Sequence, residues 1–378
     1  MRKPLSQLDF DRYLVTTAIA LLVIGMVMIA SASSEIAQIQ LNEPFYYLGH
    51  QVAYVIIGIV AASVVLRFEF EYWYAYSHVL LLIGLVLLMI VLIPGIGREI
   101  NGSQRWIGLG FLNLQVSEFI KFALVIYLAG YLTRHQQEVK TRVSGFLKPM
   151  IILGVIALLL LKEPDFGAAF VLSLTVLAML FLAGARLWQF MLTFVVLLTV
   201  LGYVAISAPY RMARLTAFLN PWQHQFGSSY QLTQSLIAFG RGGITGVGLG
   251  DSVQKLFYLP EAHTDFLFAV LAEELGLIGV LVVIILYSIL IGRSLCIGWQ
   301  AHQHQKWAAG YTAYGFAVWL AMQAAINMGV TAGLFPTKGL TMPLLSYGGS
   351  SMLINCVVLA ILLRIDYENR QLKRQKIR

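Results

Sequence analysis

Long apolar stretches recur along the whole chain and alternate with shorter polar segments. A run of about 18 or more apolar residues is long enough to form a helix that crosses a bilayer. We expect ten transmembrane helices, at residues 13–32, 48–66, 77–94, 115–133, 147–161, 166–184, 188–208, 265–291, 307–329 and 344–363. The pattern predicts an all-α polytopic integral membrane protein with a single membrane domain over residues 1–378. The fifth stretch is short and is expected to be tilted or to end in residues 162–165.

Composition supports this class. The chain is 59% hydrophobic and 12% charged, whereas soluble domains average about 25% charged residues. Many of the 7 Trp and 18 Tyr residues lie at segment ends, as an interfacial belt requires. Cys296 and Cys356 lie near apolar stretches and are interpreted as packing residues, with no sign of a disulfide frame or zinc site. The net charge of +8 does not indicate nucleic acid, because the basic residues lie where cytoplasmic loops are expected.

The basic residues also predict the orientation. With the N-terminus inside, 17 of the 26 Lys and Arg residues lie in segments facing the cytoplasm and 8 lie outside. This asymmetry favours cytoplasmic termini, with a tail at 1–12, a large extracytoplasmic loop at 209–264 between the seventh and eighth spans, and a basic tail at 364–378. The first stretch ends in Ala30-Ser31-Ala32, which resembles a signal-peptidase site, but its length and the preceding Asp9 and Asp11 favour an uncleaved span.

A carboxylate stands at the mouth of the eighth predicted span. The loop 209–264 is too long to be a mere connection, and Asp265 follows it directly where the apolar helix begins. Enclosure would raise the pKa of Asp265 and make it a better general base. The alternative is that Asp265 caps a helix that starts at Phe266, with Thr264 as the rival cap.

Four further charged residues fall within the predicted spans. Glu118 and Lys121 are three positions apart on one helix face, so they form either a structural ion pair or a cavity wall in which Lys121 holds a pyrophosphate. Glu273 is the better candidate to line a cavity shared with Asp265, because it lies about 80° from it around the helix and Glu274 about 180°. We expect Glu274 to pair with a polar group of a neighbouring helix.

Polar and glycine-rich motifs gather in the outside loops 95–114, 209–264 and 330–343. Arg105 and Trp106 suit a sugar and a phosphate, although Trp106 alone would serve equally as an interfacial anchor. Residues 230–240 predict a short helix in the interface, followed by a close-approach glycine loop that is not a nucleotide fingerprint. No zinc cluster, hydrolase elbow, Walker loop or haem motif is present in the sequence, and only His263 among the histidines lies near the candidate site.

Short motifs spread over nearly the whole chain resemble one family. They are Asn101-Gly102-Ser103-Gln104-Arg105-Trp106, Ser117-Glu118-Phe119-Ile120-Lys121, Pro164-Asp165-Phe166-Gly167, Tyr210-Arg211, Gly240-Arg241-Gly242, Ser252-Val253-Gln254-Lys255, and the runs 227–234, 259–266, 272–276, 336–340 and 346–351. The chain resembles the SEDS family (shape, elongation, division and sporulation). Residues 230–235, 252–255, 261–263 and 337–339 are more similar to its division members than to its elongation members.

The resemblance implies a peptidoglycan glycosyltransferase that polymerises lipid II at the outer face of the bacterial cytoplasmic (inner) membrane during septal cell-wall synthesis. It also implies a class B penicillin-binding protein and other division-complex membrane proteins as partners. By position, Asp265 takes the family's catalytic carboxylate, and five residues match functionally sensitive positions: Arg105, Trp106, Glu118, Lys121 and Asp165. Three departures stand out, Val116 for Pro, Glu163 for Gln and Asp251 for Asn; the last two add negative charge and leave a divalent-cation requirement open.

The remaining candidate substrate-binding residues are Arg211, Arg241, Lys255, His263, Glu273 and Lys338. Three alternatives stay open beside the division-type polymerase. One is an elongation-type polymerase, another is a transporter that flips lipid II, and the last is a scaffold that recruits division proteins. The outside concentration of polar loops and the lack of internal repeats favour an enzyme over a transporter.

Overall fold

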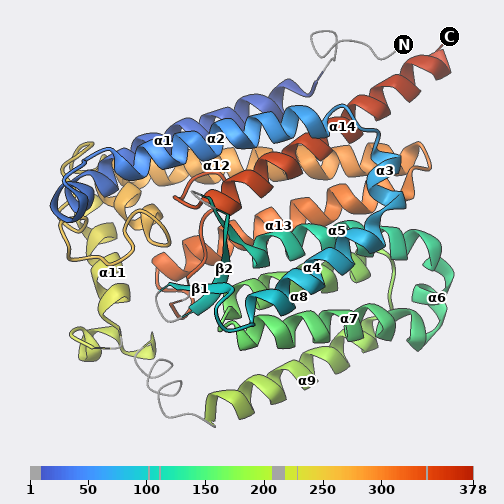
Figure 1. The fold of residues 1–378 in the computed structure, drawn as a ribbon, viewed down its shortest axis with the longest axis horizontal. Coiled ribbons are helices and arrows are strands. Elements are labelled where there is room, and N and C mark those ends of the chain that lie inside the picture. Colours follow the sequence, from blue (N-terminus) through green and yellow to red (C-terminus); the bar gives the residue numbers. More distant parts are fainter. Residues whose placement is uncertain are drawn as a thin grey trace.

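The computed structural model describes residues 10–100, 103–109, 112–206, 218–227, 229–337 and 339–377. Helices run roughly along the long axis of the molecule, and the first described residues lie at the same end as the last described residues (Figure 1). The short helix α11 lies at the opposite end (Figure 1). The helices are α1 (Arg12–Leu41), α2 (Tyr46–Val65), α3 (Phe70–Ala75), α4 (Ser77–Val91), α5 (Val116–Arg134), α6 (Gln136–Thr141), α7 (Val143–Lys162), α8 (Phe166–Leu182), α9 (Leu187–Ile206), η2 (Pro221–His224), α11 (Tyr230–Gly242), α12 (Leu267–Gln303), α13 (Trp307–Thr331) and α14 (Gly349–Ile377).

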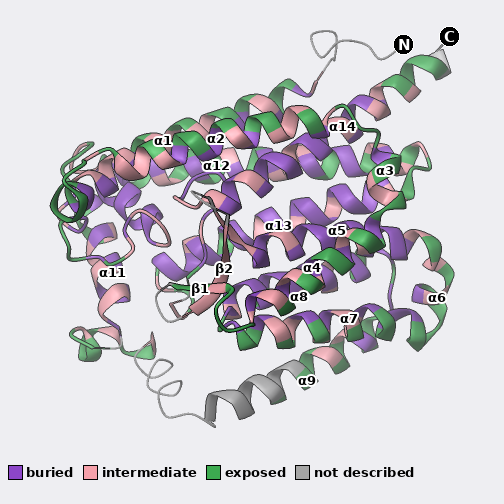
Figure 2. Ribbon diagram, in the orientation of Figure 1, coloured by how far each residue is buried: buried purple, intermediate pink, exposed green. Residues whose placement is uncertain are grey.

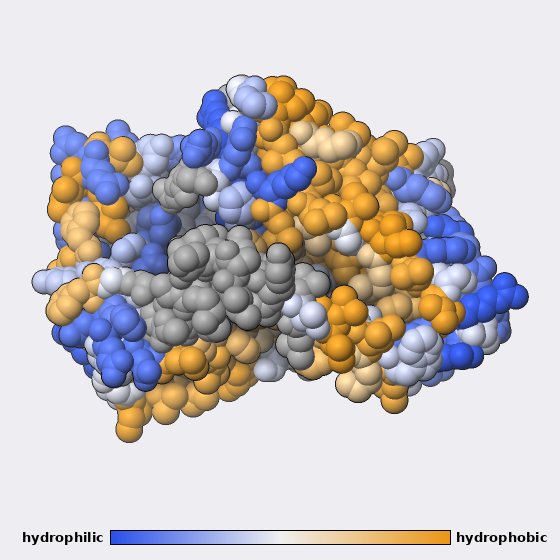
Figure 3. Space-filling view, turned by 90° about the horizontal axis from the view of Figure 1, so that it is seen from below, coloured by the Kyte–Doolittle hydropathy of each residue, from blue (hydrophilic) through white to orange (hydrophobic). Residues whose placement is uncertain are grey.

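Many of these helices are apolar along their length. Within the described ranges, seven are long and apolar enough to cross a membrane: α1, α2, α5, α7, α12, α13 and α14. Three shorter apolar helices are Ser77–Val91, Phe166–Leu182 and Leu187–Val196. Hydrophobic residues spread over one face between hydrophilic groups at both ends of the long axis (Figure 3). The chain is therefore an all-helical polytopic membrane protein apart from one small sheet, as the hydrophobic pattern predicts.

The centre of the bundle is α5. In its most apolar window 83% of the residues are buried, against 28% in the windows of α2 and α12, which expose apolar side chains as lipid-facing helices do. Helices α4, α8, α13 and α14 pack around α5, and α2 covers α14 while α1 covers α12. Buried residues accordingly concentrate along α5 and α13 (Figure 2). This core fixes the helix ends on which the candidate site is built.

The outside loop 95–114 contains a small sheet, which the all-α prediction did not include. Strands β1 (Gly97–Ile100), β2 (Ser103–Leu109) and β3 (Leu112–Gln115) pair antiparallel in that order. Trp106 lies opposite Arg98 on one side and Gln115 on the other. Strand β2 reads Ser-Gln-Arg-Trp-Ile-Gly-Leu, polar in its first half and mostly apolar in its second, so it has no alternating pattern that would mark it as a strand. Arg105 and Trp106 both belong to the middle strand of this sheet.

The eighth predicted span is broken near its start. Gly276 in α12 has φ 63° and ψ −163°, a conformation that only glycine adopts readily. The loop after α11 pairs with the backbone exposed by the break, because the amides of Val247 and Gly248 donate to the carbonyls of Glu273 and Glu274 at 3.0 and 3.1 Å. A Cβ on Gly246 would lie 2.1 Å from the Glu274 carbonyl oxygen. Because they carry no side chain, the glycines of this loop allow its backbone to contact the backbone of α12 directly.

Three helices extend well beyond their predicted ends: α1, α12, which continues to Gln303, and α14. Helix α1 continues to Leu41, so the Ala30-Ser31-Ala32 sequence lies inside it. Helix α14 continues to Ile377, so most of the predicted polar tail 364–378 is helical. Asp11 caps α1 by accepting from the Leu14 amide at 2.9 Å, and it also pairs with Arg293 of α12. These contacts fasten the N-terminal end of the bundle.

Candidate active site

A cavity of about 870 Å³ opens where the outside segments meet the helix ends. Its wall is formed by the start of α2, β2 and β3, the first turn of α5, the loop before α12 and the loop before α14. A smaller pocket of about 220 Å³ adjoins it. The two share five lining residues: Arg105, Asp165, Glu261, Asp265 and Gly339. The candidate base Asp265 and the candidate cation Arg105 therefore lie where the large cavity and the smaller pocket meet. We call the cavity and the pocket the two chambers.

Asp265 is half-buried and is not a helix cap. Helix α12 begins at Leu267, and its N-cap residue is Phe266, which makes no side-chain cap bond, so the capping interpretation of Asp265 is wrong. Its backbone carbonyl accepts from the Asn327 side chain at 2.8 Å. Among the described residues, nothing donates a hydrogen bond to its carboxylate. Burial, with Glu261 nearby, raises the pKa of Asp265 to about 7, which suits a general base at neutral pH.

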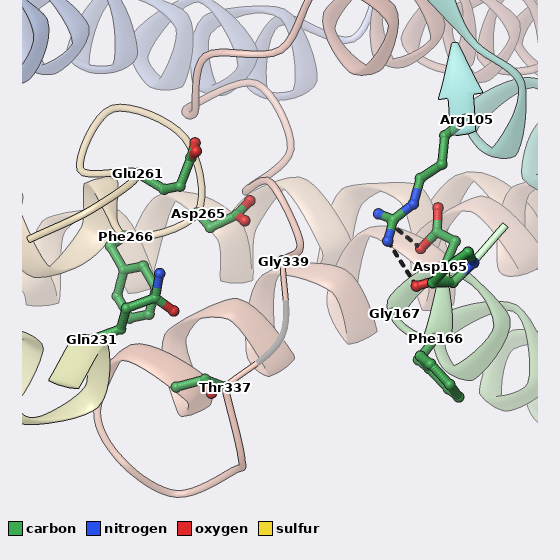
Figure 4. A pocket seen from close by; sticks show the side chains of 11 residues that line it. Arg105, Asp165, Phe166, Gly167, Gln231, Glu261, Asp265, Phe266, Thr337 and Gly339 are labelled. Carbon is green, nitrogen blue, oxygen red and sulfur yellow. Dashed lines mark hydrogen bonds and ion pairs between the residues drawn. The ribbon is translucent and has the colours of Figure 1, made fainter. Parts of the chain in front are cut away.

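Arg105 faces Asp265 across the smaller pocket. Asp265 and Glu261 approach from one side, and Arg105 and Asp165 from the other (Figure 4). The Arg105 guanidinium donates to the carbonyls of Glu163 and Pro164 at 3.0 and 2.7 Å, and it lies 3.8 Å from the Asp165 carboxylate. Two of its five N–H donors are engaged in these hydrogen bonds, so others can reach an anionic ligand.

Carboxylates surround this cation. Asp165 caps α8 through a 3.1 Å bond from the Ala168 amide, and its other oxygen is buried without a partner among the described residues. Glu163 is fully buried, and neither of its oxygens has a partner in the same set. Burial first, and then Asp165, raise the pKa of Glu163 to about 8. The raised pKa favours the neutral form of Glu163, so the residue adds less negative charge than its sequence position suggests.

The predicted pair in α5 is formed, but only one member reaches the cavity. Lys121 donates to Glu118 and to Gln323, both at 2.8 Å, and it lies 5.0 Å from the centre of the Trp319 ring. Glu118 lines the cavity, whereas Lys121 is 1% exposed and lies behind it. The contacts match the structural ion-pair alternative, in which Lys121 holds Glu118 in place.

The charged residues at the break in α12 lie away from both chambers. Glu273 accepts from the Ser252 hydroxyl at 2.5 Å and pairs with Arg241 at 3.2 Å. Glu274 pairs with Lys255 at 3.0 Å and accepts from Ser31 of α1 at 2.6 Å. The pairing expected for Glu274 is therefore confirmed. Among the described residues that line the two chambers, Arg241, Lys255 and Glu273 are not found.

The other candidates are placed as follows. Trp106 and His263 line the large cavity, and burial lowers the pKa of His263, so its imidazole is neutral. Arg211 and Lys338 lie outside the described residues. Within the described part of the chain, no group of three or more His, Cys, Asp and Glu side chains is arranged to hold a metal ion.

Sequence reasoning passed over several wall residues. Glu261 lines both chambers and accepts from the Thr264 hydroxyl at 2.7 Å. Its position four residues before Asp265 was the available signal. Gln231 of α11 lines the smaller pocket, and Tyr47 and Tyr347 line the larger. Tyr347 falls in the motif 346–351, which was the available signal, whereas nothing in the local sequence of Tyr47 marks it as part of a cavity.

Comparison with known proteins finds relatives over nearly the whole chain. Residues 11–371 match the family described as "Cell cycle protein", FtsW/RodA/SpoVE. The chain is 56% identical over 361 residues to the "Probable peptidoglycan glycosyltransferase FtsW" of Legionella pneumophila, covering 96% of this chain and 92% of that one. The protein of the same name from Coxiella burnetii is 54% identical over 360 residues, covering 95% of this chain and 97% of that one.

Two solved structures share the fold. One, described as "Structural coordination of polymerization and crosslinking by a peptidoglycan synthase complex", gives a TM-score of 0.79 at 27% identity, covering 96% of this chain and 99% of that one. The rod shape determining protein RodA of Thermus thermophilus gives 0.72 at 26% identity, with the same coverage. The chain belongs to the FtsW/RodA/SpoVE family of cell cycle proteins, the SEDS family that its motifs resemble.

Proposed function

We propose that this chain is a peptidoglycan glycosyltransferase that polymerises lipid II, the activity named for its relatives from Legionella and Coxiella. One observation carries the proposal. Asp265 presents a carboxylate with a pKa raised to about 7 at the junction of two chambers, with Arg105 facing it. A base and a cation on opposite sides of one space are what a glycosyl transfer from a pyrophosphate donor requires.

The reaction joins two lipid-linked disaccharides. The 4-hydroxyl oxygen of one disaccharide forms a bond to C1 of the muramyl sugar at the end of the other chain. The bond from that C1 to the pyrophosphate oxygen breaks, and undecaprenyl pyrophosphate leaves with the bonding electron pair. Asp265 accepts the proton of the attacking hydroxyl, which is a poor nucleophile unless a base is positioned beside it.

The leaving pyrophosphate develops negative charge and needs donors fixed in advance. Among the described residues, Arg105 is the cation that lines both chambers. Its guanidinium is held by the carbonyls of Glu163 and Pro164 just after α7. Lys121 acts through Glu118, and Arg211 and Lys338 stay candidate ligands of the pyrophosphate. Asp265 supplies the base and Arg105 binds the anion, and no step is assigned to a divalent cation.

The topology follows from the same proposal. The seven long helices and three shorter apolar helices of the described chain fall at the ten predicted spans. The start of α1 and the end of α14 lie at the end opposite α11 (Figure 1). The excess of basic residues assigns this end to the cytoplasm. The cavity then opens at the outer face of the bacterial inner membrane, below the extracytoplasmic loop 209–264.

The partner is a class B penicillin-binding protein that cross-links the strands. Support comes from the solved chain described as part of a peptidoglycan synthase complex, which has the same fold. The curated relatives carry the FtsW name, which favours a division role at the septum, beside other division-complex membrane proteins, over an elongation role.

The deciding experiment is polymerisation of purified lipid II by the full chain with its cognate penicillin-binding protein. Asp265→Asn removes the base and keeps the size of the side chain, so we expect a loss of at least about 100-fold in rate. The variant should still insert and bind its partner. Polymerisation at the wild-type rate would show that Asp265 is not the base. Movement of lipid II between leaflets without glycan strands would instead favour a transporter.

A further inference from the structure

Three aromatic rings form a part of the cavity wall to which the reaction above assigns no role. Tyr47, His263 and Tyr347 all line the 870 Å³ cavity. The centre of the Tyr47 ring lies 4.5 Å from that of His263 and 5.4 Å from that of Tyr347, and the two tyrosine rings are nearly perpendicular. The rings of His263 and Tyr347 are 5.6 Å apart. These are the separations of mutually packed aromatic groups.

Hydrogen bonds join the three distant segments that carry these rings. The Tyr347 amide donates to the His263 carbonyl at 3.1 Å. Gln51, one turn after Tyr47 in α2, accepts from the Gly348 amide at 3.3 Å. The beginning of α2, the loop before α12 and the loop before α14 are therefore joined at this point. The aromatic wall exists before any ligand arrives, so binding costs little ordering of these side chains.

The polar edges of this wall are unoccupied by protein. Within the described residues, the hydroxyls of Tyr47 and Tyr347 make no hydrogen bond, although both side chains reach the cavity. The imidazole of His263 is neutral, so one ring nitrogen donates and the other accepts. No cation of the described chain belongs to this group of rings. The wall therefore offers aromatic faces together with neutral donors and acceptors.

We propose that Tyr47, His263 and Tyr347 form a carbohydrate subsite that holds the N-acetylhexosamine rings of the acceptor strand beside Asp265. The proposal rests on the proposed function. A pyranose ring presents C–H groups of slight positive charge, which suit the negative face of an aromatic ring, and hydroxyls at its edge. A pyrophosphate would find no positive charge here, and an isoprenoid chain would bury the hydroxyls without hydrogen-bond partners.

The location also favours the acceptor over the donor. His263 and Asp265 line the same cavity from one loop, two residues apart. A sugar packed on the rings therefore lies near the base that must take its 4-hydroxyl proton. The donor's pyrophosphate belongs near Arg105, which is carried by β2. The two substrates are then bound by different chemistry, with neutral stacking for the acceptor and charge for the donor.

The test is direct binding to the full-length chain in detergent, measured by calorimetry with two probes. The first probe is a lipid-free tetrasaccharide of alternating N-acetylglucosamine and N-acetylmuramic acid, and the second is farnesyl pyrophosphate. Tyr47→Leu and Tyr347→Leu should each weaken tetrasaccharide binding about tenfold and leave farnesyl pyrophosphate binding unchanged. Arg105→Ala should do the reverse. Tyr347→Phe, which keeps the ring, should lose less than Tyr347→Leu.

Tyr76→Leu is the matched control, because Tyr76 is 61% exposed and lies on neither chamber. It should change neither affinity. The subsite is overturned if the wild-type chain does not bind the tetrasaccharide, if the tyrosine variants bind it as the wild type does, or if they lose both probes together. These results would leave the polymerase intact wherever lipid II is still polymerised. Selective loss of the tetrasaccharide without any polymerisation by the wild type would keep the subsite and remove the polymerase.

Discussion

Two groups of charged residues lie at opposite ends of the short part of α12 that precedes its break at Gly276. The two groups differ in how their charges are paired. The cavity group consists of Arg105, Asp165, Glu261 and Asp265, and it stands at the start of α12. The break group consists of Arg241, Lys255, Glu273 and Glu274, and it stands just before Gly276. At about 1.5 Å per residue, Glu273 is roughly 12 Å along the helix from Asp265.

Pairing separates the two groups. At the break, Lys255 and Glu274 lie 3.0 Å apart with side chains 6% and 0% exposed. In the cavity, Arg105 is 3.8 Å from Asp165, and the Asp265 carboxylate has no hydrogen-bond donor among the described residues. A buried charge is tolerated when paired, so the break group stabilises the fold. A charge left without a close partner in a cavity is available to a substrate.

The largest expected effect falls on the break group. Lys255→Met leaves the buried Glu274 carboxylate with the Ser31 hydroxyl as its remaining partner among the described side chains. Breaking a buried pair in this way costs about 3–5 kcal/mol. We expect a clear drop in the thermal unfolding temperature of the purified chain. Adding Glu274→Gln removes the unpaired charge and should recover much of the loss.

Asp265→Asn is the contrasting variant. It should leave the unfolding temperature unchanged or slightly higher, because the side chain that it replaces is an unfavourably placed charge. A Lys255→Met chain as stable as the wild type, or no recovery in the double variant, would show that the break group does not fasten the fold.

A smaller loss of stability is expected when the glycine at the break in α12 is replaced. Gly276→Ala places a Cβ on a residue at φ 63°, 2.3 Å from the Gly246 amide nitrogen. Strain of this kind costs about 1–3 kcal/mol. Gly292 is the matched control in the same helix, since a Cβ there meets nothing within 4 Å. Gly292→Ala should be neutral or stabilise by up to about 1 kcal/mol. Equal unfolding temperatures for the two variants would contradict a specific requirement for glycine at the break.

Hydrophobic length predicted the apolar helices well because crossing a bilayer demands a minimum run of apolar residues. The same signal could not show the break in α12. The immediate neighbours of Gly276, Leu275 and Leu277, are apolar, and the break is stabilised by a loop about 30 residues earlier in the chain. The sheet at 97–115 was missed for a related reason, since its strands are short and its glycines and polar residues are equally typical of a loop.

Helical spacing placed residues on a face but could not say what that face meets. It paired Glu118 with Lys121 correctly, yet the direction of Lys121, toward Gln323 and Trp319, depends on α13. It also favoured Glu273 as a cavity residue, whereas the break in α12 and the loop after α11 enclose that side chain. Tyr47 and Tyr347 belong to the cavity only because segments about 300 residues apart meet.

The smallest predicted effect concerns the pH dependence of the cavity group. The ionised form of Asp265 is the base, so the rate should rise with pH through its pKa of about 7. Burial raises this pKa most, Glu261 raises it further, and Arg105 lowers it. Glu261→Gln removes a negative charge, so the pKa of Asp265 falls and the acidic limb of the rate profile moves to lower pH by less than about one unit. Arg105→Gln should move the limb upward. Glu69→Gln, at an exposed position beside α3, should not move it, and a Glu261→Gln limb displaced upward would remove Asp265 as the titrating base.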